Sequence, residues 1–189
     1  MITYTHNEKE YKLRNDANEV NLKELGQVSA IMNESEDGYL SRWIKVVDLL
    51  GSKGLSDVIS QDGLTEFINN FEVANVKSDI VKEIEVNGIT YSLLVNNGEV
   101  ELSAKEMSLI EDRIKLGGNW ASFVFALIFK QSGMSRVDNF SSAHIEKKAK
   151  IFETEITADI ASPIIYQLNK KIVESIAKMT KLHAESKAV

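Results

Sequence analysis

Apolar and polar residues alternate around a short polar turn at two places in the chain, and each place predicts a β-hairpin. The first hairpin is expected over residues 2–6 and 10–14, joined at Asn7-Glu8. The second is expected over residues 84–95, where Asn87-Gly88 lies between β-rich flanks. Because Asn and Gly both tolerate the positive φ angles of a type I′ turn, this dipeptide is a strong hairpin signal.

A capping signal follows each hairpin and predicts where the first helix of each half begins. Asn21 stands three residues before Glu24, and Ser103 stands three residues before Glu106. In a capping box the first side chain bonds the backbone N–H of the glutamate, whose own side chain reaches back to the backbone N–H of the first residue. Both halves are therefore expected to start their first helix by the same mechanism.

The spacing of apolar residues predicts two further helices in each half, over about residues 38–50 and 62–71 and over about 118–130 and 142–152. The apolar residues of the helix over 38–50 share one face of the helix; they are Leu40, Trp43, Ile44, Val47 and Leu50. The helix over 118–130 is apolar nearly all round and is expected to be the central buried helix. Residues of this kind at helical spacing fill a core more often than a ligand pocket; here they are Trp43, Trp120, Phe123, Phe125 and Phe129.

A long amphipathic helix is predicted at the C-terminus, with Ser162 as its N-cap and Pro163 as its first residue. Its apolar stripe is the candidate partner-binding surface and consists of Ile165, Leu168, Ile172, Ile176 and Met179. Such a stripe can dock on the protein's own body, on a second copy of the chain, or in a partner's groove. This helix has no counterpart in the first half. An intermolecular contact is therefore an alternative to self-docking.

The second half repeats the first at a fixed offset of 80 residues. Six residues recur identically at this offset: Asn7, Tyr11, Leu13, Glu19, Val20 and Leu22 return as Asn87, Tyr91, Leu93, Glu99, Val100 and Leu102. The pattern predicts an α+β fold built by tandem duplication of a hairpin and about three helices. The expected units are residues 1–79, residues 80–160, and a C-terminal helix and tail over 161–189.

Composition places the chain among soluble globular proteins and favours a cytoplasmic location. The net charge of −6 has the wrong sign for general affinity to nucleic acid, which is not expected as a partner. There are no cysteines, which excludes disulfides and thiol chemistry. No secretory signal is recognisable, and the longest apolar stretch, about Phe123 to Phe129, is far below the roughly 20 residues that span a bilayer, so no membrane contact is expected.

Candidate chemical groups do not form a recognisable catalytic, cofactor or metal site, and the chain is therefore expected not to be an enzyme. The histidines His6, His144 and His183 lack metal-ligand spacing, and Gly117-Gly118 is read as a break between helices rather than a phosphate loop. The lysines near residue 148 are expected on a solvated helix face; they are Lys147, Lys148 and Lys150.

The layout resembles tailed-phage tail or baseplate assembly chaperones. The resemblance rests on short strand openings of the type Ile-x6-Tyr-x-Leu and on the last 70 or so residues, where Ala143–Phe152 leads through Thr157–Pro163 into the amphipathic helix. It implies a non-enzymatic factor in the host cytoplasm that binds apolar helical segments of a tail or baseplate protein. A structural subunit of a phage particle is the alternative. The family has no fixed motif, so the resemblance assigns no binding residue.

Overall fold

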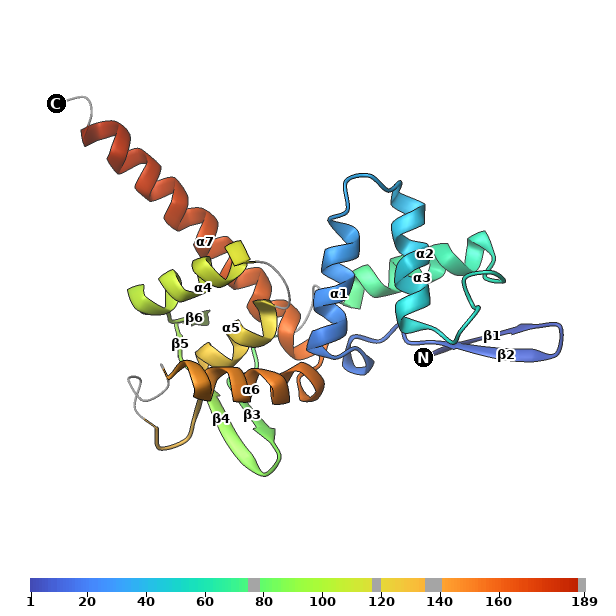
Figure 1. The fold of residues 1–189 in the computed structure, drawn as a ribbon, viewed down its shortest axis with the longest axis horizontal. Coiled ribbons are helices and arrows are strands. Elements are labelled where there is room, and N and C mark those ends of the chain that lie inside the picture. Colours follow the sequence, from blue (N-terminus) through green and yellow to red (C-terminus); the bar gives the residue numbers. More distant parts are fainter. Residues whose placement is uncertain (75–78, 117–119, 135–140, 187–189) are drawn as a thin grey trace.

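The chain folds as an α+β protein whose two halves each enclose a hydrophobic core (Figure 1). This confirms the predicted fold class. A computed structural model describes residues 1–74, 79–116, 120–134 and 141–186, without the side chains of 72–74, 142 and 175–186. Gly117 and Gly118, where a helix break was predicted, lie outside the described residues.

The first half is a hairpin followed by a short 3-10 turn and three α-helices. Strands β1 (Ile2–His6) and β2 (Lys9–Leu13) pair antiparallel. The 3-10 turn η1 (Ala17–Glu19) leads into α1 (Leu22–Met32), α2 (Tyr39–Leu50) and α3 (Gln61–Ala74). The core of this half includes Trp43, which meets the rings of Phe67 and Phe71 edge-on.

The second half has the same opening but a larger sheet. Strands β3 (Glu83–Val86) and β4 (Ile89–Leu93) form its hairpin, and β5 (Val95–Asn96) pairs with β6 (Glu99–Val100). The helices are α4 (Ala104–Leu116), α5 (Trp120–Ile128) and α6 (Ser142–Glu155), followed by α7 (Ala158–Ser186). Both predicted capping boxes are present, with Asn21 and Glu24 at α1 and with Ser103 and Glu106 at α4.

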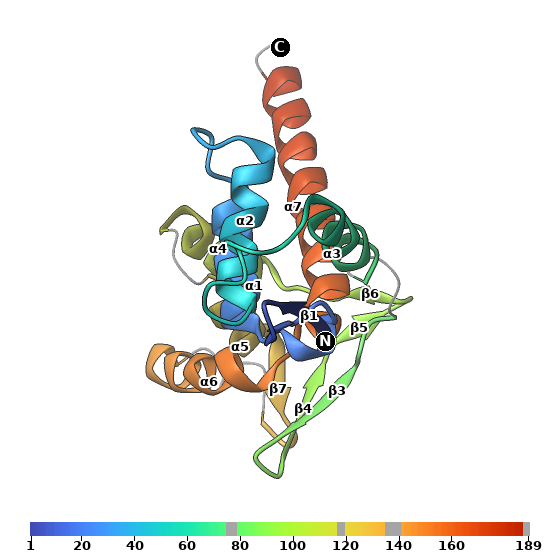
Figure 2. The same cartoon turned by 90° about the vertical axis from the view of Figure 1, so that its right-hand side faces the viewer.

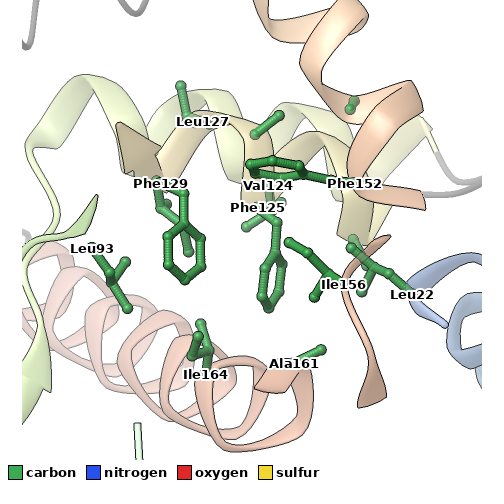
Figure 3. Close-up of a cluster of buried hydrophobic side chains, with 14 of the residues drawn as sticks. Leu22, Leu93, Val124, Phe125, Leu127, Phe129, Phe152, Ile156, Ala161 and Ile164 are labelled. Carbon is green, nitrogen blue, oxygen red and sulfur yellow. The ribbon is translucent and has the colours of Figure 1, made fainter. Parts of the chain in front are cut away.

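The helix predicted over residues 118–130 ends early, because its last residues become a strand. Phe129–Gln131 form β7, which pairs antiparallel with β4 and makes a three-stranded sheet. Helix α5 is the central buried helix, as predicted, with seven buried residues. Figure 3 shows the rings of Phe125 and Phe129 between α5 and the Ala161–Ile164 turn of α7, and the two rings stack at 5.8 Å.

A short backbone link joins the two halves. The N–H of Leu22 donates to the carbonyl of Ile156 at 2.7 Å, and the N–H of Ala158 donates to the carbonyl of Val20 at 2.7 Å. Each segment also contributes a fully buried side chain to the other half, because Leu22 lies in the second-half core and Ala158 in the first-half core. Hydrogen bonds and packing therefore hold the halves together at the same point.

Each half has a hairpin followed by three helices, and the second half adds the strands β5, β6 and β7 and the helix α7. Both hairpin turns have positive φ angles, at Asn7 (49°) and Glu8 (62°) and at Asn87 (53°) and Gly88 (73°). Strand partners then shift the alignment: Leu13 bridges Gly51, whereas its counterpart Leu93 pairs with Phe129. Residues of α2 therefore correspond to residues of α5 at an offset of 78, two fewer than the 80 found for the hairpins. A common origin of the two halves stays a prediction.

Two helix predictions need correction. The buried face of α2 is centred on Trp43, Val46, Val47 and Leu50, and it leaves Leu40 and Ile44 exposed. The C-terminal helix begins at Ala158 instead of Pro163, because the carbonyl of Thr157 already accepts the N–H of Ala161 at 3.0 Å. Pro163 lies inside α7, where it lacks the N–H that a helical hydrogen bond needs.

Candidate functional site

The first part of α7 is docked on the protein's own second half. Leu168 is only 1% exposed, and Ile165 and Ile172 are half-buried against the same core. Three of the five residues predicted to bind a partner are thus covered by their own chain, and for them self-docking is what the structure shows. The side chains of Ile176 and Met179 lie outside the described residues.

A polar clasp fixes the exposed side of this docked segment. Gln167 accepts a hydrogen bond from the N–H of Val100 and donates one to the carbonyl of Gly98, both at 3.1 Å. One turn later Lys171 pairs with Glu99 at 3.1 Å. The hydrogen bond from Lys171 holds the pKa of the Glu99 carboxyl below its usual value. The β5–β6 hairpin therefore binds α7 through two hydrogen bonds from its backbone and one ion pair.

A groove of about 520 Å³ runs beside the clasp. One wall is α7 from Pro163 to Glu174, and the other is the β5–β6 turn with Asp79 and Ile80. Its rim carries charges of both signs, including Lys170, Glu174 and the paired Lys171 and Glu99. No single charge dominates the rim, so the groove has no evident preference for a cation or an anion.

The rest of α7 is the most distinctive surface feature of the fold. The helix continues for 29 residues in all, and its C-terminal part extends well beyond the body in both views (Figures 1 and 2). We call residues 173–186 the α7 arm. Val173, at the start of the arm, is 66% exposed. At Val173 the exposed side of this helix is open to another protein.

Buried charges form a second notable cluster, in the second-half core. Glu106 accepts hydrogen bonds from the N–H and hydroxyl groups of Ser103 at 2.7 and 2.8 Å, and its other oxygen lies 3.4 Å from the ammonium of Lys130. Lys148 is also buried and donates to the carbonyl of Phe129 at 2.8 Å. These contacts tie α4, β7 and α6 together.

Lys148 corrects the prediction that all three lysines of this helix lie on a solvated face. Lys147 and Lys150 are exposed, whereas burial and the positive charge of Lys130 lower the pKa of Lys148 to about 8. The sequence did contain a signal for this. Lys148 stands three residues after Ile145 and four before Phe152, which is the spacing of the buried face.

Two kinds of feature were not found in the described part of the chain. Within it, no three His, Asp or Glu side chains are grouped so that they could hold a metal ion. Nor does any helix there have the length and apolar character needed to cross a membrane.

Comparison with known proteins gives no relative. No protein-family model matches the chain, and neither the curated proteins nor the solved structures contain a match. The function has to be inferred from the chain's own residues.

Proposed function

We propose that this chain is a non-enzymatic assembly factor that binds an apolar helical segment of a partner protein, as tailed-phage tail or baseplate assembly chaperones do. The observation that carries the proposal is the α7 arm, a helix that continues past its docking site into solvent (Figure 1). Helices with an apolar stripe bind partners by lying against another helix or in a groove. The remaining elements of the fold hold the docked first part of α7 in place.

The docked segment explains how a single helix can be presented without a partner. An isolated helix of fewer than about 12–15 residues is marginal in water. Here Leu168 and the clasp at Gln167 hold the first turns of α7 in place, so the arm continues a helix that is already formed. The partner would then meet a preformed helix, which lowers the entropy cost of binding.

The binding residues within the arm are assigned from the sequence pattern. Ile176 and Met179 continue the apolar stripe that Leu168 and Ile172 begin, and lysines such as Lys178 flank them. We expect Ile176 and Met179 to make the apolar contact with a tail or baseplate protein. A net charge of −6 is consistent with a protein partner and not with nucleic acid. The location that fits this role is the host cytoplasm.

Coexpression with phage tail and baseplate proteins tests the proposal. An assembly chaperone should form a soluble complex with one of these proteins and be absent from the finished particle. Presence in the particle at a fixed stoichiometry would instead support the alternative, a structural subunit. Failure to bind any of these proteins would reject both.

Substitutions in the arm test which surface makes the contact. Replacing Ile176 and Met179 together with Asp should abolish complex formation, because two charges would enter an apolar contact. Ala177→Asp is the matched control: it adds a charge to the same arm about 100° around the helix from Ile176, outside the stripe, and should leave binding nearly unchanged. Equal loss in both variants would argue against a stripe-specific contact.

A further inference from the structure

Strand β1 is an outer edge of the first hairpin, and its outward backbone groups have no backbone partner in the described part of the chain. The turn at Asn7-Glu8 has two residues, so His6 and Lys9 close the ladder as a hydrogen-bonded pair. Such pairs alternate along the ladder, so the N–H and C=O groups of Thr3 and Thr5 point away from β2. Among the described residues, no backbone group outside the hairpin bonds to either threonine.

The opposite edge of the hairpin is closed by the chain itself. Lys12 of β2 donates its backbone N–H to the hydroxyl of Ser52 at 2.9 Å, and its carbonyl accepts the N–H of Ser52 at 2.8 Å. Lys12 therefore points away from β1, and its ladder partner Thr3 must point away from β2. The hairpin is thus paired along β2 and open along β1.

The second half has the same open edge but protects it with charge. At the offset of 80, Thr3 and Thr5 correspond to Glu83 and Glu85, which are exposed on the edge strand β3. Charged side chains on an edge strand deter another strand from pairing there. Strand β1, over Ile2–His6, contains no carboxylate, lysine or arginine. Its edge therefore lacks the protection that β3 has.

The sequence of β1 is suited to pairing with a second copy of itself. Thr3-Tyr4-Thr5 reads the same in both directions, so two antiparallel copies centred on Tyr4 place Thr3 opposite Thr5 on both sides of the centre. Threonine pairs and aromatic pairs on adjacent strands stabilise a sheet. Tyr4 is half-buried, and its hydroxyl donates to the carbonyl of Gly63 at 3.2 Å, so the ring is already held in one position.

We propose that β1 of one copy pairs antiparallel with β1 of a second copy, about a twofold axis at Tyr4. Thr3 and Thr5 of each copy exchange backbone hydrogen bonds with Thr5 and Thr3 of the other. The two hairpins then form one sheet in the order β2–β1–β1–β2. The same edge of both copies is used, so the contact closes at a dimer.

This contact goes beyond the function proposed above, because it uses β1 and leaves α7 free. The hairpin and the tip of α7 lie at opposite ends of the molecule in Figure 1. The two proposals can therefore fail separately. A chain that dimerises without binding a tail or baseplate protein would refute only the proposed function, and a chain that binds such a protein but never dimerises would refute only the β1 contact.

Sedimentation equilibrium of the full chain from about 1 μM to about 1 mM tests for the dimer. We expect a reversible equilibrium between monomer and dimer that grows no further. A chain that remains monomeric throughout this range would overturn the proposal, and so would assemblies larger than the dimer. A monomeric chain that uses this edge to bind a strand of another protein would also overturn it.

The double substitution Thr3→Glu with Thr5→Glu gives β1 the outward residues of β3. It places like charges opposite each other in both threonine pairs and should raise the dissociation constant of the dimer at least about tenfold. Ser108→Glu with Thr154→Glu is the matched control, because it adds the same charge at exposed positions on α4 and α6 and should leave dimerisation nearly unchanged. Circular dichroism and thermal melting confirm that both variants are folded. Equal weakening in the two variants would overturn the assignment of the edge.

Introduced cysteines test the register, since the chain has none of its own. Thr3→Cys and Thr5→Cys are made as separate variants, one of them with a longer tag. In the proposed register, position 3 of one copy faces position 5 of the other with Cα atoms about 5.5 Å apart, within reach of a disulfide. Two copies of the same variant would hold their cysteines more than about 7 Å apart, beyond that reach.

Oxidation of the mixture should therefore give the disulfide-linked dimer of the two variants, whereas either variant alone should form little. The dimers are distinguished by mass on a non-reducing gel. Cross-linking in a single variant but not in the mixture would overturn the pairing about Tyr4. The absence of any cross-link at a concentration where the native chain is a dimer would overturn it as well.

Discussion

The ammonium of Lys130 lies 3.4 Å from the carboxylate of Glu106, and both side chains are buried in the second half. Glu106 is also the capping-box residue of α4, so one carboxylate starts a helix and balances a buried charge. The first half uses a related arrangement in a more exposed place. There the capping glutamate of α1, Glu24, accepts two hydrogen bonds from Arg14 at 2.9 and 2.8 Å. In each half a cation beside the hairpin therefore holds the start of the first helix.

Removing the charge of Glu106 should destabilise the protein more than the same change at Glu24. Glu106→Gln removes the carboxylate charge beside the buried Lys130 and should lower the free energy of unfolding by about 3 kcal/mol. Glu24→Gln affects a pair that is partly exposed and should cost about 1 kcal/mol. Urea unfolding of both variants measures the difference. Similar losses at the two positions would show that burial of the Lys130–Glu106 pair adds nothing to its strength.

Lys148 makes the stability of the protein depend on alkaline pH. Its pKa is about 8 in the folded protein and about 10.5 when unperturbed, so the unfolded chain binds the extra proton between these values. Stability therefore rises with pH across this window, because deprotonation removes the penalty of a buried charge from the folded state. From pH 8 to pH 10 the gain in free energy of unfolding should be about 2 kcal/mol.

Urea unfolding at pH 7, 8, 9 and 10 measures this gain, and Lys148→Met serves as the reference. Methionine keeps much of the apolar volume and removes the titrating group. The variant should lose the rise in stability that Lys148 causes, and at pH 7 it should be at least as stable as the native chain. A native chain whose stability falls steadily from pH 8 to pH 10, in parallel with the variant, would contradict the lowered pKa.

The two hairpin turns allow a reciprocal test of backbone strain. Glu8 adopts a φ of 62°, a left-handed conformation that costs a residue with a side chain about 1 kcal/mol, whereas Gly88 holds the equivalent place with a φ of 73°. Glu8→Gly should therefore stabilise the protein by about 0.5–1 kcal/mol, and Gly88→Glu should destabilise it by about as much. Thermal melting measures both. A β-carbon at Gly88 would meet no atom within 4 Å, so the substitution measures only the cost of the left-handed backbone conformation.

Much of the fold could be predicted because the signals were local. The turn at Asn87-Gly88 and the capping boxes at Asn21 and Ser103 depend on a few adjacent residues, and the structure contains all of them. Strand β7 was missed because Phe129 continues the apolar run of α5. What turns Phe129–Gln131 into a strand is pairing with β4, nearly 40 residues earlier in the chain, which no local pattern reports.

Prediction of the candidate site was limited in the same way, because its contacts also join distant parts of the chain. The predicted apolar stripe of the C-terminal helix includes the buried Leu168, but a period does not say what covers the face it identifies. Leu168 proved to be a core residue, and Val173, between the stripe positions, is exposed. The clasp at Gln167 was also missed, because it bonds backbone groups some 70 residues away and leaves no pattern in the sequence. The spacing of Ile44 from Leu40 and Val47 placed it on their apolar helical face, yet Ile44 is 39% exposed.

The docking of α7 predicts opposite outcomes for two apolar residues of the same helix. Leu168→Ala removes a side chain that is almost completely buried and should lower the free energy of unfolding by about 2–5 kcal/mol, through lost burial and the cavity left behind. Val173→Ala changes an exposed residue just over one turn farther along and should stay within about 0.5 kcal/mol of the native chain. Urea unfolding of both variants gives the two free energies. Suppose that Leu168→Ala leaves stability unchanged but abolishes binding to a partner protein. Then α7 is not docked on its own body in solution, the stripe from Ile165 to Met179 is a single intermolecular surface, and the arm cannot be treated as the only part of the helix that binds.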